Sequence, residues 1–168
     1  PEVTAVNVTV PGFKEVNFSF KHKHDKSKSL PFMASAVIDI DNDGTEEVFF
    51  GGGHNQPDGL FAFKNGGFED IYGGSGLTKP DNDTTLGSVV IDVNNDTFSD
   101  LIVTRNSGIY LYTNQNGKFT GANLNVPIDE KTTPLSVAVA DINRDGHFDM
   151  YVSGYISVNF IEGQNIFN

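Results

Sequence analysis

Three acidic loops of one design carry the residues of this chain that are best suited to chemistry. Each loop places an oxygen-bearing side chain at its positions 1, 3, 5 and 9. Aspartates at alternate positions of a tight turn can all point inward, and the backbone carbonyl at position 7 adds one more oxygen. Calcium is a hard cation that takes about six to eight oxygen ligands. The spacing therefore predicts one calcium ion in each loop, up to three in the chain.

The three loops differ in charge and in one backbone position. Gly44 and Gly146 occupy position 6, where a sharp backbone reversal favours glycine, whereas loop two has Thr97 there. Loop one carries four acidic side chains and the others carry three each, so we expect the tightest calcium binding at loop one and the weakest at loop two. The expected ligands of loop one (39–47), loop two (92–100) and loop three (141–149) are, in order, Asp39, Asp41, Asp43, the Thr45 carbonyl and Glu47; Asp92, Asn94, Asp96, the Phe98 carbonyl and Asp100; and Asp141, Asn143, Asp145, the His147 carbonyl and Asp149.

Other interpretations of these loops are an EF-hand, a magnesium site and a set of plain turns. An EF-hand needs a bidentate Glu at position 12 and a helix on each side. Position 12 here is Phe50, Val103 or Val152, each within an apolar run. Magnesium prefers to keep its waters. Asp and Asn also form ordinary turns, but three copies of one spacing at a matched repeat favour calcium.

The segments around each loop repeat along the chain as well. The loops begin at residues 39, 92 and 141, so the repeat is 53 and then 49 residues long. A run of small and β-branched residues precedes each loop, and an apolar run follows it. The first two copies add a third run that ends at an Asn-Gly turn, and then a fourth. A unit of about 50 residues with four short strands is typical of a β-propeller blade.

The predicted fold is therefore all-β, a β-propeller built of four-stranded antiparallel sheets. Closed propellers usually have about four to eight blades, so we expect about three blades here to be part of a larger propeller. The alternative is a compact three-sheet domain that is complete as it stands. Because the sequence at 12–16 matches that at 67–71, the N-terminal segment is interpreted as the outer strand or strands of a preceding or closing blade. The expected single partial domain covers residues 1–168, with blades at 32–72, 86–121 and 135–168 and the outer strand or strands at 1–20.

Composition excludes several classes of protein. The formal net charge of the 168-residue chain is -11, which disfavours a nucleic-acid partner because phosphate backbones attract basic faces. Three divalent ions would bring this charge to -5. The chain has no cysteine and therefore no disulfide framework. No apolar run approaches the roughly 18 residues of a membrane span.

The loops and their flanking strands resemble the FG-GAP and VCBS repeat family. These are calcium-loop propellers of integrin α chains and many secreted bacterial proteins. The similarity covers about residues 32–168, and the run at 58–77 is similar to the subgroup shared with cartilage acidic protein. The integrin-like Phe-Gly and Gly-Ala-Pro signatures are not present in full, so no integrin-type ligand is inferred. The resemblance implies a β-propeller outside the cell, with calcium in its loops.

The expected function is that of a calcium-binding extracellular recognition or adhesion module with no catalysis of its own. It would be secreted or at the cell surface, with a protein or glycan ligand there, and its open blade edges are candidates for pairing with another chain. One alternative is a fragment of a calcium-stabilised propeller enzyme, a lyase or hydrolase acting on polysaccharide. Another is a purely structural domain of a larger surface protein. For the enzyme alternative, the sequence offers few polar candidates that are not metal ligands: His54, Asp58, Lys79 and Arg105.

Overall fold

The computed structural model describes residues 12, 18–23 and 32–156. Most of the expected N-terminal strand at 1–20 lies outside these residues, as does the end of the third expected blade, 157–168. Residues 18–23 have no assigned strand. Phe18 nevertheless packs on sheet one, because its ring centroid lies 4.5 Å from that of Phe61 and 4.8 Å from that of Phe68.

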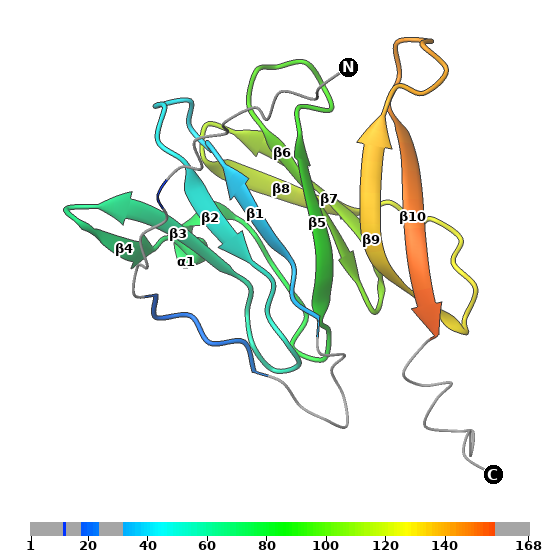
Figure 1. Ribbon diagram of the computed structural model, residues 1–168, viewed down its shortest axis with the longest axis horizontal. Helices are drawn as coiled ribbons and strands as arrows, with labels where there is room; N and C mark the ends of the chain where they lie inside the picture. The colour runs from blue at the N-terminus through cyan, green and yellow to red at the C-terminus, as the bar shows by residue number, and fades with distance from the viewer. Residues whose placement is uncertain (1–11, 13–17, 24–31, 157–168) are drawn as a thin grey trace, which may run out of the picture.

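The described strands form three antiparallel sheets that stand side by side (Figure 1), so the predicted all-β class with four-stranded blades is confirmed. In every sheet, strands that follow one another in the sequence are paired. One short helix, α1 (Tyr72–Ser75), follows sheet one. Sheet one contains β1 (Ser35–Ile38), β2 (Glu47–Phe50), β3 (Gly59–Lys64) and β4 (Gly67–Asp70); sheet two contains β5 (Thr85–Ile91), β6 (Asp100–Arg105), β7 (Gly108–Gln115) and β8 (Lys118–Asn123); sheet three contains β9 (Thr132–Ala140) and β10 (Asp149–Ile156).

The acidic loops connect the first two strands of each sheet, in one register. The residue before position 1 pairs with the residue at position 9, giving Ile38 with Glu47, Ile91 with Asp100 and Ala140 with Asp149. The Asn-Gly turns close the β3–β4 and β7–β8 hairpins. Both turn residues have the positive φ that a two-residue hairpin turn of this type requires, at 53° and 82° in the first turn and 50° and 78° in the second.

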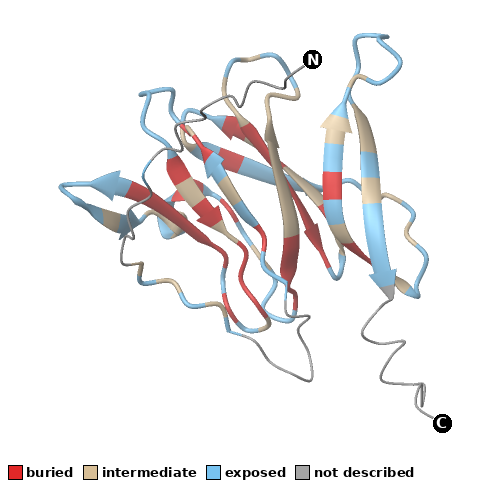
Figure 2. Ribbon diagram, in the orientation of Figure 1, coloured by how far each residue is buried: buried red, intermediate tan, exposed pale blue. Residues whose placement is uncertain are grey.

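Sheet two is packed on both of its faces. Side chains alternate between the faces of a strand, and β6 is buried along its whole length. Leu101 and Val103 belong to the core shared with sheet one, which includes Phe49 and Leu60. Ile102, between them, belongs to the core shared with sheet three. Figure 2 shows the buried residues concentrated in sheets one and two, whereas most of sheet three is exposed or intermediate.

The first strands of neighbouring sheets lie close together, which explains their small residues. The Ser88 hydroxyl of β5 donates to the Ser35 carbonyl of β1 at 3.0 Å. On the other side of β5, a Cβ atom added to Gly87 would lie 2.3 Å from the Leu135 carbonyl oxygen of β9. Bulkier side chains at these positions would force the sheets apart.

This close approach predicts the effect of Gly87→Ala. The new methyl group would meet a backbone carbonyl that cannot rotate away, so we expect a loss of about 1–3 kcal/mol in the free energy of unfolding, measured by urea denaturation. Gly73→Ala is the control, since a Cβ atom at Gly73 would meet nothing within 4 Å. A Gly87→Ala protein with the wild-type urea midpoint would contradict the close packing of sheets two and three.

Candidate metal centres

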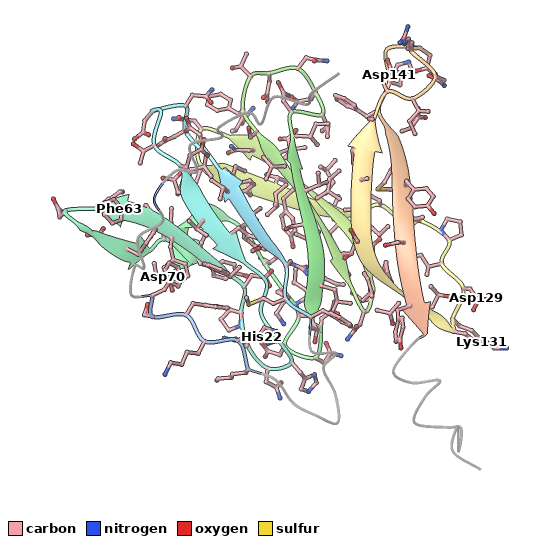
Figure 3. The ribbon with its side chains drawn as sticks, in the orientation of Figure 1. His22, Phe63, Asp70, Asp129, Lys131 and Asp141 are labelled. Atoms are coloured by element: carbon pink, nitrogen blue, oxygen red, sulfur yellow. The ribbon has the colours of Figure 1, made fainter. Side chains whose placement is uncertain are left out.

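All three acidic loops project from one end of the molecule (Figure 1). Figure 3 shows Asp141 just beyond the end of β9, where loop three begins. Each loop sits on the first hairpin of its sheet, so the spacing between loops is the spacing between sheets. The fold therefore repeats one local arrangement three times.

The loops share one backbone path. Position 6 is left-handed in all of them, with φ of 83° at Gly44, 79° at Thr97 and 86° at Gly146. This conformation suits glycine but strains a β-branched residue. Thr97 therefore follows the path set by its neighbours against its own preference. Position 4 is left-handed too, with φ of 58°, 59° and 62° at Asn42, Asn95 and Arg144.

Three hydrogen bonds recur in every loop. The position-9 carboxylate accepts from the position-2 N–H, at 3.2, 2.9 and 2.9 Å in loops one to three. The position-1 carboxylate accepts from the position-6 N–H, at 3.0, 2.9 and 2.9 Å. The position-5 carboxylate accepts from the position-7 N–H, at 2.7, 2.9 and 2.9 Å. Side chains at positions 1, 5 and 9, all expected ligands, are thus tied to the loop backbone.

Loop one brings its carboxylates closest together. Asp39, Asp41 and Asp43 each offer an oxygen atom, and these atoms lie within 4.8 Å of one another. One oxygen of Asp39, Oδ1, is buried and has no hydrogen-bond partner. A buried carboxylate oxygen without a partner is costly, so this atom calls for a positive charge or a donor beyond those of the described residues.

Loops two and three replace the position-3 carboxylate with an amide. The Asn94 side-chain oxygen accepts from the Asp96 N–H at 3.0 Å, and its Nδ2 donates to the Asp96 carboxylate at 2.9 Å. Asn143 and Asp145 make the same pair of bonds at 3.0 and 2.8 Å. An amide donor beside the carboxylate relieves repulsion that loop one retains. Loop one is therefore the most strongly anionic of the three.

The position-9 carboxylates of loops one and two are buried. Burial raises the pKa of the Glu47 carboxyl above its ordinary value, the hydrogen bond from the Ile40 N–H opposes this shift, and the loop aspartates add to it. Burial also raises the pKa of Asp100, against the opposing N–H donors of Asn114 and Val93. In both loops the desolvated position-9 carboxylate lacks a compensating positive charge among the groups that shift its pKa.

The polar residues weighed for catalysis have structural contacts instead. Asp58 and Arg105 form an ion pair of 2.9 Å, and each side chain is 1% exposed. Arg105 also donates to the Thr85 hydroxyl, the Tyr112 hydroxyl and the Thr78 carbonyl, at 3.1, 2.9 and 2.9 Å. Asp58 accepts from the Gly52 N–H at 2.8 Å. This network joins sheet one to sheet two.

The other two candidates lie near the glycine-rich connection between β2 and β3. The Lys79 amino group donates to the backbone carbonyls of Gly53 and Asp83, at 3.1 and 2.6 Å. Partial burial lowers the pKa of Lys79. His54 is half-buried in that connection. The four candidates lie at the end of the sheets opposite the acidic loops, and two of them are closed to solvent.

Sequence reasoning missed Asn114, which touches two loops at once. Asn114 is buried in β7, and its side chain donates to the Ile40 carbonyl of loop one at 2.8 Å and to the Ser99 carbonyl of loop two at 3.1 Å. Comparison of the two copies of the repeat could have identified this residue. Asn114 stands two residues before the Asn116-Gly117 turn, where the first copy has the apolar Phe63, so a polar side chain replaces an apolar one within a strand.

Comparison with known proteins agrees with this architecture. Residues 92–152, from loop two to the strand after loop three, match the family model of the FG-GAP-like repeat. This match confirms the resemblance to FG-GAP repeats that the loops and their flanking strands indicated. Repeats of this kind are typical of extracellular modules. Within the described residues, no helix has the length and apolar character needed to cross a membrane.

A curated relative extends the similarity over most of the chain. The T-cell immunomodulatory protein homolog of Plasmodium falciparum (isolate 3D7) is 29% identical over 167 residues. The alignment covers 92% of this chain but only 22% of that protein. The chain thus spans about a fifth of the length of the relative it matches.

The strained residue in loop two gives one prediction. Thr97→Gly should stabilise the protein by about 0.5–1 kcal/mol, because relief of the left-handed strain exceeds the entropy that glycine adds to the unfolded chain. Chemical denaturation measures this change. As a control, Thr120→Gly in the exposed part of β8 should be destabilising, since glycine weakens a strand. Equal losses in both variants would mean that Thr97 is not strained.

The buried ion pair of Asp58 and Arg105 gives a second prediction. Arg105→Met should cost about 3–5 kcal/mol of unfolding free energy, because it leaves the Asp58 charge buried without its partner. The double variant Asp58→Asn, Arg105→Met removes both charges and should recover part of that loss. Urea denaturation of the two variants provides the comparison. A single variant as stable as the double would show that the pair carries no such penalty.

Proposed function

We propose that this chain is a calcium-binding extracellular recognition or adhesion module with no catalysis of its own. The observation that carries this proposal is loop one, where three carboxylates converge within 4.8 Å and a buried oxygen of Asp39 lacks a partner. A hard divalent cation fits such a site, because it neutralises the cluster and satisfies that oxygen. Calcium is preferred to magnesium since it accepts flexible, oxygen-rich coordination with few waters.

The ligands would come from the same positions in each loop. In loop one they are the side chains of Asp39, Asp41, Asp43 and Glu47 with the carbonyl of Thr45. Loops two and three would use positions 1, 3, 5, 7 and 9 in the same way, and their shared backbone path and hydrogen bonds support this extension. Up to three ions would then stabilise the hairpins on which the sheets are built.

A recognition role is supported by the similarity to FG-GAP-like repeats and by the burial of two polar residues that were candidates for catalysis. Extracellular modules bind calcium with dissociation constants of about 0.1–1 mM, which matches sites made on short exposed loops. Asp58 and Arg105 are buried against each other and so are not presented to a substrate. We propose that the protein is secreted or lies at the cell surface, with a protein or glycan ligand.

The name of the curated relative suggests which kind of partner to test first. The relative is described as a T-cell immunomodulatory protein homolog, so we favour a protein ligand on a cell surface over a glycan. This chain spans only about a fifth of that relative's length, so a protein partner for this chain is a proposal and does not follow from the relative's name. Binding to cell-surface proteins and to a glycan array, with and without calcium, separates these ligands. Turnover of a polysaccharide by the chain would overturn the proposal that it has no catalysis of its own.

Calcium binding itself is tested by thermal unfolding. Ions that bind only the folded state stabilise it by mass action, by about 1.4 kcal/mol for each site at calcium tenfold above the dissociation constant. The melting temperature should therefore rise with calcium and fall with a strong chelator. Asp39→Asn should reduce this response, whereas Asp81→Asn, on an exposed loop outside the three sites, should preserve it.

Calorimetry completes that experiment by giving the order of filling. Loop one, with four acidic side chains, should fill first. A melting temperature that does not respond to chelator or calcium would reduce the loops to plain turns. Filling of loop two before loop one would contradict the ranking by charge and by the position-6 residue.

A further inference from the structure

Loops one and two are joined by a chain of hydrogen bonds through Asn114, and we propose that calcium at one loop thereby strengthens calcium binding at the other. This inference rests on the proposed function, since it presupposes that the loops bind calcium. It adds that the two sites act as a pair, whereas among the described residues no such chain of bonds joins loop three to either of them. The observation that carries it is the set of bonds that runs from the position-9 carboxylate of loop one to that of loop two.

The first bridge is buried and continuous. The Glu47 carboxylate accepts from the Ile40 N–H at 3.2 Å. The carbonyl of the same residue, Ile40, accepts from the Asn114 side-chain amide at 2.8 Å. The Asn114 backbone N–H donates in turn to the Asp100 carboxylate at 2.7 Å. Two residues, Ile40 and Asn114, therefore connect two expected calcium ligands, Glu47 and Asp100.

The second bridge runs over the surface. The Asn42 side chain, at position 4 of loop one, donates to the Thr97 carbonyl of loop two at 3.1 Å. Thr97 is the strained position-6 residue, and its N–H donates to Asp92, the position-1 carboxylate, at 2.9 Å. Loop one thus helps to hold loop two in a conformation that its own sequence disfavours.

These bridges couple the sites because ordering one loop removes freedom from the other. Ile40 stands between Asp39 and Asp41, so an ion that fixes both aspartates also fixes the peptide to which Asn114 is bonded. Asn114 then holds Asp100 in place before the second ion arrives. A site whose ligands are already ordered loses less conformational entropy on binding. Such coupling is reciprocal, and commonly amounts to a factor of about five or more in affinity.

Loop three provides an internal reference. All the hydrogen bonds of its acidic side chains among the described residues stay within residues 141–149. Among the described residues, the bridge through Asn114 joins loops one and two, and none of its bonds reaches loop three.

The test is a calcium titration of the full chain followed by NMR, with one backbone amide reporting on each loop. Gly44, Thr97 and Gly146 all occupy position 6 and bond to the position-1 carboxylate. In the Asn114→Ala protein, the calcium midpoint of Thr97 should move at least about fivefold higher, while that of Gly146 stays in place. Asn123→Ala, which removes an amide from the other end of sheet two, should move neither.

A second variant keeps the test valid if loss of the buried Asn114 disturbs folding. Asn42→Gly breaks the surface bridge without strain, because glycine accepts the φ of 58° at that position. It should also raise the Thr97 midpoint. Asn95→Gly is its matched control, at position 4 of loop two with φ of 59°. By reciprocity, Asp92→Ala, which disables loop two, should raise the Gly44 midpoint.

The outcomes separate this inference from the proposed function. If no position-6 amide responds to calcium, the proposed function fails and the coupling fails with it. If the amides respond but Asn114→Ala and Asn42→Gly leave the Thr97 midpoint unchanged, the loops bind calcium independently and only the coupling is wrong. A shift confined to Thr97 and Gly44, absent from both control variants, supports the inference.

Discussion

The hydrogen bond from position 2 to position 9 is the constraint on which the rest of the structure depends. It closes each acidic loop at the base of its hairpin, and the residues beside it pair in the same register in all three sheets. Because a shift of one residue would turn every side chain to the opposite face, this closure decides which residues enter the cores. In sheets one and two this closure places a buried carboxylate, Glu47 or Asp100, at the start of the second strand.

Sheet two shows how that register is used. Its strand β6 alternates side chains into two different cores, with Leu101 and Val103 on one side and Ile102 on the other. Polar contacts between sheets one and two lie at the two ends of this apolar core. At one end of the sheet, Arg105 reaches Asp58, which directly precedes β3 of sheet one, and near the other end Asn114 reaches Ile40 of loop one. The boundary between sheets one and two is therefore fixed by apolar packing in its middle and by hydrogen bonds at both ends.

The repeating part of this architecture could be predicted from the sequence, because it is local. Strands flanking each loop and the Asn-Gly turns are encoded within a few residues of one another, and three copies reinforce the pattern. Helix α1 was not expected, since it consists of one turn that contains two glycines. The sequence marks Thr97 as an exception at position 6, but its left-handed backbone angle cannot be predicted from the residue type, because the neighbouring hydrogen bonds impose it.

Contacts between sheets could not be predicted in the same way. Asp58 and Arg105 are 47 residues apart, and Asn114 is 74 residues from Ile40. Nothing in the local pattern specifies such partners, so two residues weighed for catalysis form a buried pair, and an asparagine inside a strand was overlooked.

Among the described strands, only those that are consecutive in the sequence pair, and this has a consequence for how the chain assembles. Sheet one ends at Asp70 before sheet two begins at Thr85, and no described strand waits for a distant partner to complete its ladder. Contacts between segments close in sequence form with little loss of chain entropy. As the chain leaves the ribosome, sheet one can complete its hydrogen bonding before sheet two is synthesised. Each later sheet can then pack against one that has already formed.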